Sequence, residues 1–590
     1  MEIYQSRLFL SENELLIIKK NYNTISIFRL IATLFFLIFG YYFFKTESTF
    51  YIYLSLVSLA IFLLLMRVHN KIDHQKKLKE ALIEINQNEI SFLNREKIPF
   101  DNGIEFNDFQ HTYAYDLDIF GENSLFQNLN RTFTYIGKKT LSNALLSKFS
   151  NNEILENQES IEELSHKIDF RQDFMSISKI SKDNKSNYDN LLLWIQFNNK
   201  PLSKLAQILS FLLPIVFAVL VLLYVITKNE LFFTCSSFSF IINLIFAGRF
   251  LKRIKLENAH STNINKIVKQ YGLLIQKIEQ EPFTSKKLTD LQNLLLSNNQ
   301  KASVALNQLS ELFAKLDALG NMVMTVILNG TVLYHVHNLK DIINWKKNNH
   351  QNLEKWLHLI GEIEMLNSLA NFKYNNPEFV FPTLNNNREI AFESLSHPLL
   401  NPKTRIGNDI SFQPQSFVIL TGSNMSGKST FLRSLGINMV LAGMGSPVCA
   451  AKANIHPMKI LVSMRLSDSL SDSESYFYAE IKRLKQIMNE LDNKPGFVLL
   501  DEILRGTNSD DKRSGTIEVI KKMLAKNAIG AIATHDIEVC LTTNEFPTQL
   551  INKCFEVAIV NNDLHFDFKL QDGICKNKSA TFLMTKMGVI

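Results

Sequence analysis

Cysteine is scarce in this chain of 590 residues, and none of its cysteines forms a Cys-x-x-Cys pair or a Cys/His cluster at metal-ligand spacing. The five are scattered: Cys235, Cys449, Cys540, Cys554 and Cys575. This pattern argues against a disulfide framework and against a structural zinc site. A reducing, cytosolic setting fits it best.

A strong charge of one sign is also lacking. Lys and Arg total 63 against 57 Asp and Glu, a formal net charge of +6. So small a surplus permits contact with nucleic acid or an anionic membrane but predicts neither. Low-complexity linkers are absent too, and the only internal repeat is a doubled pair of apolar runs.

Four runs lack charge over about the 17–25 residues that a helix needs to cross a bilayer. They are Ile27–Phe44 (with Arg29 at its margin), Ser48–Met66, Leu205–Thr227 and Leu231–Gly248. Because only a few residues separate the members of each pair, the sequence predicts two transmembrane helical hairpins. The alternative is two helical hairpins buried in a soluble core.

Basic residues flank both hairpins on the same side. The first pair of runs lies between Lys19, Lys20 and Arg67, Lys71, Lys76, Lys77, Lys79; the second lies between Lys200, Lys204 and Arg249, Lys252, Arg253, Lys255. The turns inside the hairpins carry little positive charge. By the positive-inside rule we expect a multi-pass protein of the cytoplasmic membrane with all its large segments in the cytoplasm.

A fifth apolar stretch, Met322–Leu333, is interrupted by Asn329 and Gly330 and runs into two histidines. We interpret it as a buried core helix rather than a span. The polar segment before it has helical spacing and suits long antiparallel helices. The expected organisation is a segment 1–100 with a hairpin at about 27–66, a helical core 101–200, a second hairpin 201–252, a helical lever 253–387 and an α/β P-loop ATPase domain 388–590.

The strongest local signal is the segment Ser416–Gly436, in which a short apolar run precedes Gly-x-x-x-x-Gly-Lys-Ser and a helical pattern follows. This is the P-loop pattern, in which backbone N–H groups and a helix N-terminus face phosphate. Lys428 should reach the β- and γ-phosphates of ATP, and the Ser429 hydroxyl should ligate Mg²⁺. The predicted nucleotide-binding residues are Gly422, Ser423, Asn424, Met425, Ser426, Gly427, Lys428, Ser429 and Thr430.

A second apolar run, Phe497–Leu500, ends in Asp501 and Glu502. Open α/β sheets bind ligands at the carboxyl ends of their strands. Asp501 should therefore hold Mg²⁺, directly or through water, and Glu502 should orient and polarise the attacking water.

A third apolar run, Ala528–Ala533, ends in Thr534, His535 and Asp536. A histidine at this place near the γ-phosphate suits a switch residue, and we favour that role for His535. The alternative is an ordinary hydrogen-bonded histidine at the end of a strand.

These segments resemble the MutS family. The resemblance rests on TGSNMSGKST at the P-loop, DEILRGTNSDD from Asp501, and Ser475–Glu480, which is similar to the family's STF-x-x-E signature with Tyr476 in place of Thr. It implies that Ser475 reaches the γ-phosphate of a partner protomer and that the protein is a homodimer with composite ATP sites. Further similarity lies in Ser396-His397-Pro398, in Phe568–Leu570 with a helix ending in Gly588, and in Asp116–Leu145 of the helical core.

The chain also departs from the family. Its first hundred residues hold an apolar hairpin and no Phe-x-Glu motif, which mismatch-recognising members place beside a mispaired base. Basic residues that could contact phosphate, such as Lys286 and Lys287, suit a solvated helix face better.

The resulting hypothesis is a membrane-anchored MutS-like ATPase that uses ATP and Mg²⁺, with DNA, including mismatched DNA, as a candidate partner. One alternative is an ABC-type transporter, although no LSGGQ-like signature is present and the apolar runs lack polar residues for a pathway. Another is a membrane-tethered ATPase whose clamp acts on a protein partner.

Overall fold

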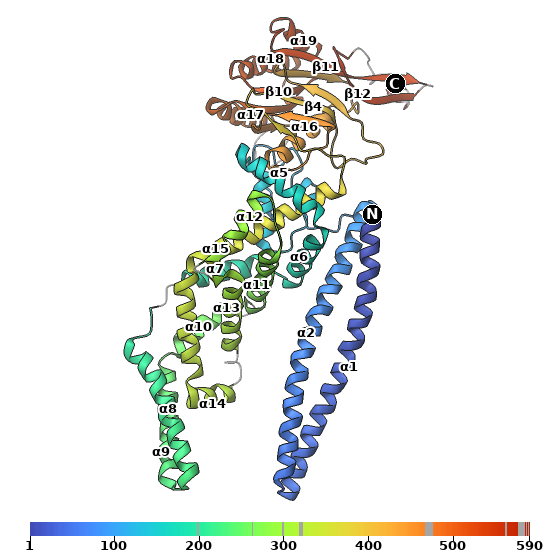
Figure 1. The fold of residues 1–590 in the computed structure, drawn as a ribbon. Coiled ribbons are helices and arrows are strands. Elements are labelled where there is room, and N and C mark those ends of the chain that lie inside the picture. Colours follow the sequence, from blue (N-terminus) through green and yellow to red (C-terminus); the bar gives the residue numbers. More distant parts are fainter. Residues whose placement is uncertain are drawn as a thin grey trace.

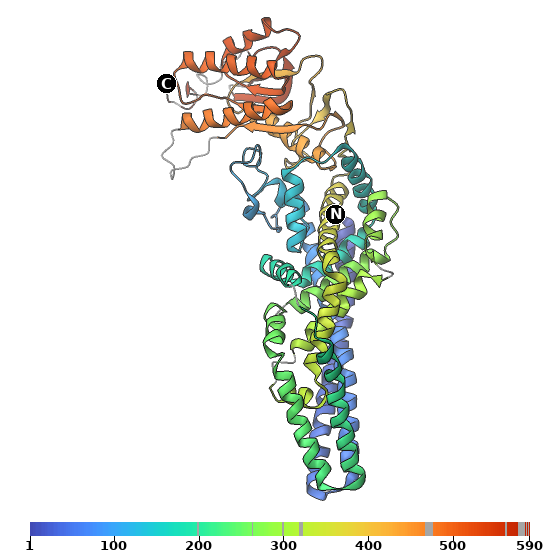
Figure 2. The same cartoon turned by 90° about the vertical axis from the view of Figure 1, so that its left-hand side faces the viewer.

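The computed structural model describes residues 1–197, 200–261, 264–297, 300–317, 322–465, 476–560, 563–575, 584–585, 587 and 589. Figure 1 shows an α/β domain at one end, a helical body in the middle and two helical hairpins that extend from the body away from the α/β domain. The view turned by 90° shows both hairpins pointing the same way (Figure 2).

The first hairpin consists of α1 (Glu2–Thr46) and α2 (Thr49–Leu93), and the chain turns at Glu47 in the left-handed region (φ 54°). Each helix has 45 residues, about 67 Å at 1.5 Å per residue, which is twice the thickness of a hydrocarbon core. The apolar sequence fills only the half next to the turn. The other half continues to the body, where α2 packs against α6.

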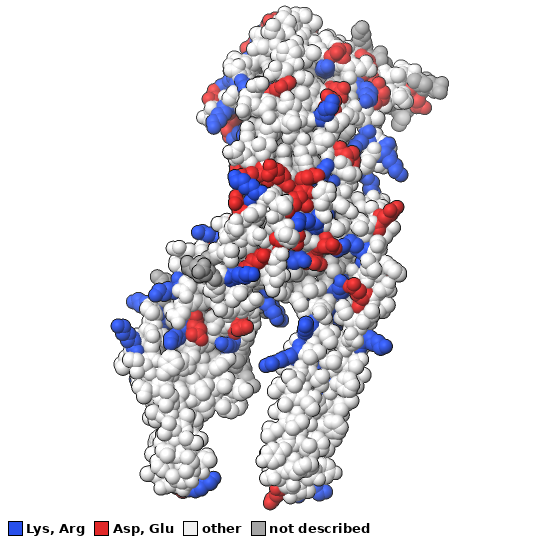
Figure 3. All heavy atoms as spheres, viewed as in Figure 1, with Lys and Arg blue, Asp and Glu red and all other residues white. Residues whose placement is uncertain are grey.

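The second hairpin consists of α8 (Lys204–Thr227) and α9 (Glu230–Gly248). These helices, with α1 and α2, are long and apolar enough to cross a membrane by length and composition. Between 6% and 28% of their most apolar windows is buried, so the structure does not place them in a soluble core. Figure 3 shows both hairpins nearly free of charge between their tips and a zone of Lys and Arg nearer the body.

The helical body is built around α15 (Tyr334–Asn375), a 42-residue helix that packs against α4, α5 and α13. The other body helices are α3 (Leu125–Leu129), α4 (Tyr135–Leu146), α5 (Asn151–His166), α6 (Ile168–Ser181), α7 (Lys185–Gln196), α10 (Leu251–Ser261), α11 (Ile264–Gln280), α12 (Lys286–Asn293) and α13 (Ala302–Asp317), with a small ladder of β1 (Leu296–Ser297) and β2 (Gln300–Lys301). Thr134 is the N-cap of α4, because its hydroxyl accepts the N–H of Gly137 at 3.0 Å.

Two buried carboxylates hold other helices to α15. Glu364 accepts the backbone N–H groups of Phe133 and Thr134, each at 3.2 Å, and the Thr134 hydroxyl. Burial raises the pKa of Glu364 to about 7 against the lowering effect of these hydrogen bonds. Glu89 of α2 pairs with the buried Arg131 and accepts the Asn371 amide of α15 at 3.1 Å. The first hairpin is therefore tied to the body through a buried ion pair.

One prediction about the body is corrected. The stretch Met322–Leu333 forms α14 (Met322–Val332), which is not a buried core helix: its buried residues are Asn329 and Gly330, whereas its apolar residues are largely exposed. The reason is that the polar interruption, not the apolar side, faces α9. Lys286 agrees with the predicted solvated helix face, because its side chain is 70% exposed while it pairs with Glu156 of α5 at 2.9 Å. Lys287 is half-buried and donates to Asn157 of α5 at 2.9 Å.

The α/β domain contains two sheets. The larger has the order β12-β11-β6-β10-β9-β8, in which β12 is antiparallel and the others are parallel. Its strands are β6 (Phe417–Gly422), β8 (Lys459–Ser463), β9 (Gly496–Asp501), β10 (Ile529–Ala533), β11 (Leu550–Val560) and β12 (Asp563–Asp572). The smaller has the order β3-β7-β4-β5, with β3 (Thr383–Leu384), β4 (Ile390–Leu395), β5 (Asn408–Ser411) and β7 (Lys452–Ile455).

Helices α16 (Lys428–Gly443), α17 (Tyr476–Asn493), α18 (Ser509–Ala525) and α19 (Ile537–Leu541) complete the domain. Every residue of β6, β9 and β10 is buried, as expected for parallel strands covered on both faces. This explains why these strands read as continuous apolar runs in the sequence.

The close pairing of β10 with β9 generates a first prediction. A Cβ added to Gly530 would lie 1.9 Å from the Val498 carbonyl oxygen, so Gly530→Ala should force the strands apart at a cost of about 1–3 kcal/mol. We expect faster amide hydrogen exchange in β6, β9 and β10, measured by mass spectrometry.

Gly443→Ala is the matched control. Its added Cβ would meet only the Lys148 Cγ, at 3.7 Å, so exchange in the three strands should not change. Equal exchange in the two variants would contradict the predicted clash.

Candidate functional site

Strand register brings the predicted site residues to one edge of the larger sheet. Ala533, at the end of β10, pairs with Leu420 of β6 on one side and with Asp501 of β9 on the other. The Glu502 N–H donates to the Ala533 carbonyl, and the Thr534 N–H donates to the Leu420 carbonyl, both at 3.0 Å. The residues that follow these three strands therefore leave the sheet together.

The P-loop connects β6 to α16. Gly427 caps the helix with φ 106°, a left-handed conformation that glycine adopts readily. The N–H groups of the first turn of α16 then point toward the loop, which gives the positive end of a helix dipole where an anion would bind. Asn424, Met425 and Thr430 are exposed, and Ser423 and Ser426 are buried.

Lys428 is buried beneath the P-loop. Its Nζ donates to the carbonyls of Gly422 at 2.8 Å and Ser423 at 3.0 Å. Burial lowers the pKa of Lys428, and the charges of Glu502 and Asp501 oppose that shift. The ammonium group is thus held at the loop with two carboxylates nearby.

Asp501 has the environment of a cation ligand. It is 8% exposed, and its Oδ1 is buried with no hydrogen-bond partner among the residues described. Ser429, half-buried in the first turn of α16, adds a hydroxyl oxygen. Carboxylate and hydroxyl oxygens are ligands of the hard kind that Mg²⁺ prefers, so this donor set fits that ion.

Glu502 and His535 contact each other. The Glu502 Oε1 lies 2.8 Å from the His535 Nε2, which lies 3.4 Å from the Lys428 Nζ. The His535 hydrogen bond lowers the pKa of Glu502 to about 2, aided by the charges of Arg505 and Lys428 and opposed by burial. Glu502 also has φ 49°, a strained conformation of the kind that clusters at functional sites.

Glu480 and Arg505 complete the site, although the sequence alone predicts a role for neither. The buried Glu480 accepts the N–H groups of Leu504 at 2.7 Å and Arg505 at 3.2 Å. The Arg505 Nε donates to the Glu502 carbonyl at 3.0 Å. Glu480 therefore fixes the loop that orients Glu502. Its signal in the sequence was its place at the end of the Ser475–Glu480 segment.

Phe568 of β12 is a further contact of the P-loop. Its ring lies 3.2 Å from where a Cβ on Gly427 would be, and its carbonyl accepts the Asn408 amide at 3.0 Å. The Cys575 N–H donates to the Thr421 hydroxyl at 3.0 Å, so the segment after β12 packs beside the loop. Two predicted features, Ser475 and the helix end at Gly588, lie outside the part of the chain that the structure describes.

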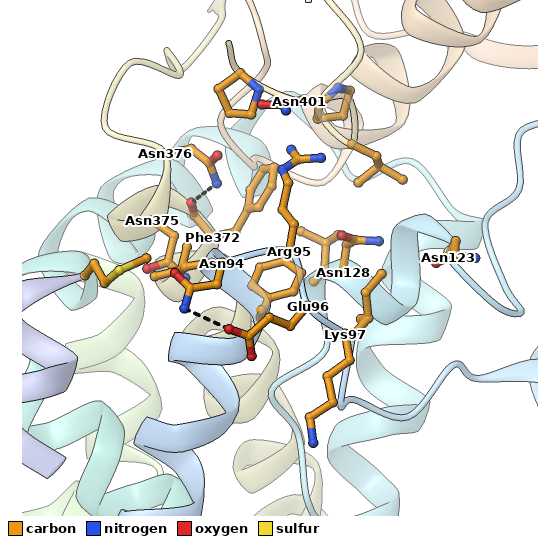
Figure 4. A pocket seen from close by; sticks show the side chains of 18 of the residues that line it. Asn94, Arg95, Glu96, Lys97, Asn123, Asn128, Phe372, Asn375, Asn376 and Asn401 are labelled. Carbon is orange, nitrogen blue, oxygen red and sulfur yellow. Dashed lines mark hydrogen bonds between the residues drawn. The ribbon is translucent and has the colours of Figure 1, made fainter. Parts of the chain in front are cut away.

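A cavity of about 810 Å³ lies elsewhere, at the junction of α2, α15 and the loop after His397 (Figure 4). Asn94, Arg95, Lys97, Asn375 and Asn401 are among its lining residues. None of the P-loop residues lines it. The Arg95 Nη2 donates to the Leu400 carbonyl at 2.8 Å and closes one side of the junction. This cavity lies between the body and the α/β domain and is not the nucleotide site.

Comparison with known proteins places the site in a family. The model of the family described as MutS domain V matches residues 418–588. The DNA mismatch repair protein MutS of Thermotoga neapolitana is 30% identical over 227 residues, which are 38% of this chain and 28% of that protein. The corresponding protein of Clostridium perfringens is 32% identical over 244 residues, 40% of this chain and 26% of its own length.

Human MutS protein homolog 4 is 28% identical over 239 residues, which are 38% of this chain and 25% of that protein. The chain thus spans between a quarter and a third of the length of these relatives. The matched family region, residues 418–588, contains the P-loop, the β9 carboxylates and His535. By this nucleotide site and the domain that carries it, residues 418–588 of the chain match the MutS family.

Proposed function

We propose that this protein is a membrane-anchored, Mg²⁺-dependent ATPase of the MutS type, in which ATP binding and hydrolysis drive a clamp formed by the helical body. The observation that carries the proposal is the convergence of Lys428, Asp501, Glu502 and His535 on one sheet edge beside a helix N-terminus. P-loop ATPases use this set of groups to hold phosphates, place a cation and position water.

The P-loop residues bind the phosphates, and two oxygen-bearing side chains bind the cation. The N–H groups of the P-loop and of the first turn of α16 bind the phosphates, and Lys428 exchanges its carbonyl partners Gly422 and Ser423 for phosphate oxygens. Asp501 and Ser429 would hold Mg²⁺. When bound, the ion neutralises charge that develops on the phosphates.

Glu502 is the group that orients water. With its pKa near 2, the carboxylate is ionised at neutral pH, but its hydrogen bond to His535 also makes it a weak base. Movement of His535 away from Glu502, toward a bound γ-phosphate, would raise the pKa of Glu502 and free an oxygen for water. The His535–Glu502 contact is therefore the position at which hydrolysis is switched.

Membrane anchoring is supported by the two hairpins. The apolar helices are exposed, the basic residues lie between them and the body, and the α/β domain is at the opposite end (Figures 1 and 3). By the positive-inside rule, this arrangement supports an ATPase domain on the cytoplasmic side. The transporter alternative is less well supported, because the two hairpins of one chain are separated in Figure 3 and do not form a bundle around a pathway.

A role related to DNA mismatch repair is proposed from the relatives, two of which are DNA mismatch repair proteins. Where mismatch-reading members carry a recognition domain, this chain has the α1–α2 hairpin. DNA bound by the body would therefore be held through its backbone, without reading of the mispaired base. The same clamp acting on a protein partner is the second candidate, favoured by the small net charge of +6.

Substitution of Glu502 tests the ATPase assignment. Glu502→Gln removes the group that polarises water, so we expect ATP hydrolysis to fall about 10²–10⁴-fold with ATP binding retained. Hydrolysis is followed by phosphate release and binding by a fluorescent ATP analogue.

The control is Glu518→Gln on α18, an exposed carboxylate that pairs only loosely with Lys521 at 3.9 Å. It should hydrolyse ATP at the parent rate. Unchanged hydrolysis by Glu502→Gln would contradict the role of this residue.

Binding to homoduplex and mismatched DNA, measured in nanodiscs over a range of salt concentrations, separates the two partner classes. We expect binding of both duplexes with equal affinity, weakening steeply with salt because backbone contacts release counterions. Preference for the mismatched duplex would contradict binding through the DNA backbone alone, and failure to bind either duplex would leave the protein partner as the candidate.

Topology is tested by proteolysis of vesicles of known orientation. A protease added to the cytoplasmic side should digest the ATPase domain and leave two protected fragments of hairpin size, because each hairpin enters and leaves on the same side. Protection of the ATPase domain from that protease would contradict the proposed orientation.

A further inference from the structure

The helix α14 is too short to cross a bilayer and too exposed for a soluble core. Its 11 residues, MVMTVILNGTV, carry no charge and span about 16 Å, half of a hydrocarbon layer. Several large apolar side chains on it are exposed: Met322 (81%), Val323 (69%), Ile327 (48%) and Val332 (48%). A continuous exposed apolar surface of this kind indicates a site that contacts another molecule or a membrane.

The buried side of α14 is fixed to the second hairpin. The Asn243 amide of α9, which is 0% exposed, donates to the Gly330 carbonyl at 2.8 Å. A Cβ on Gly330 would lie 2.2 Å from the Phe240 ring of α9, so only glycine allows this approach. In Figure 1, α14 lies crosswise beside the α8–α9 hairpin.

The depth of α14 along that hairpin follows from these contacts. Asn243 is five residues before the end of α9 at Gly248, or about 8 Å along the helix axis. The basic residues Arg249, Lys252, Arg253 and Lys255 follow directly after. The exposed face of α14 therefore continues the apolar surface of α8 and α9 just below the zone in which positive charge begins.

We propose that α14 lies in the cytoplasmic interface of the lipid bilayer, with Met322, Val323 and Ile327 among the acyl chains. Interfacial helices lie in the membrane plane with their apolar face about 5–10 Å into the boundary between headgroups and acyl chains, which matches the depth set by Asn243. Unlike the usual interfacial helix, α14 has no charged face, and its buried residues are Asn329 and Gly330. The inference rests on the proposed membrane anchoring and adds to it a contact that is not a span.

This contact has a mechanical consequence. Leu333 turns the chain in the left-handed region (φ 50°) directly from α14 into α15. The 42 residues of α15 span about 63 Å and end next to the α/β domain, where Phe372 packs on Phe379. One long helix, α15, thus joins α14 at the membrane surface to the ATPase domain. Movement of that domain would therefore move α14 relative to the bilayer.

Site-directed fluorescence in vesicles of phosphatidylcholine and phosphatidylglycerol tests the proposal. Cys235→Ser and Cys575→Ser remove the two cysteines that are not buried, and an environment-sensitive dye is placed at Val323→Cys or, in a second variant, Ile327→Cys. Val219→Cys in α8 serves as the reference for a span, and Glu311→Cys, exposed on α13, as the aqueous reference.

We expect the α14 sites to lose fluorescence to a nitroxide-labelled lipid as strongly as Val219→Cys does, and to be protected from aqueous iodide, whereas Glu311→Cys shows the opposite. If the α14 sites behave like Glu311→Cys while Val219→Cys is quenched by the lipid, α14 is not in the membrane and the anchoring stands. If Val219→Cys is not quenched by the lipid either, the anchoring falls and this inference falls with it.

Discussion

The alignment of β10 between β6 and β9 is the constraint on which the nucleotide site depends. Ala533 pairs with Leu420 and Asp501 at once, and this register brings His535, Glu502 and the P-loop to the same edge. A shift of one residue would turn every side chain of the strand to the opposite face. The absence of a Cβ at Gly530 lets β10 approach the Val498 carbonyl closely enough to keep that register.

The loop after β9 is fixed by polar groups as well as by the apolar packing of Ile503 and Leu504. Glu480 binds the backbone of Leu504 and Arg505, and Arg505 binds the Glu502 carbonyl. Burial raises the pKa of Glu480, and its two backbone hydrogen bonds offset only part of the cost of placing a carboxylate there. A catalytic carboxylate in a strained conformation persists only when its surroundings determine it in this way.

The same principle joins the hairpin end of the molecule to the α/β domain. Glu89 of the first hairpin and Glu364 of the body are both buried, and both act at α15 or on residues packed against it. Removing one partner of a buried ion pair such as Glu89–Arg131 costs about 3–5 kcal/mol. The α1–α2 hairpin, α14 and the α/β domain are thus connected through one long helix, which gives a physical route between the two hairpins and the P-loop site.

The sequence by itself determined the features that are local in the chain. A P-loop, a carboxylate pair after an apolar strand and four uncharged runs are patterns of neighbouring residues, and the helices and strands form where these patterns predict them. The resemblance to the MutS family rests on the same local segments, and the comparisons bear it out.

Tertiary structure alone decided how distant segments meet. It placed His535 against Glu502, gave Glu480 its backbone partners, paired Lys286 with Glu156 and turned the apolar side of α14 outward. The reason is that the type of a residue does not indicate which distant residue it will contact. Sheet register and helix packing decide which residues from other parts of the chain lie next to it. In α14, Asn329 and Gly330 read as interruptions of an apolar run, yet they are the residues that the packing of α9 buries.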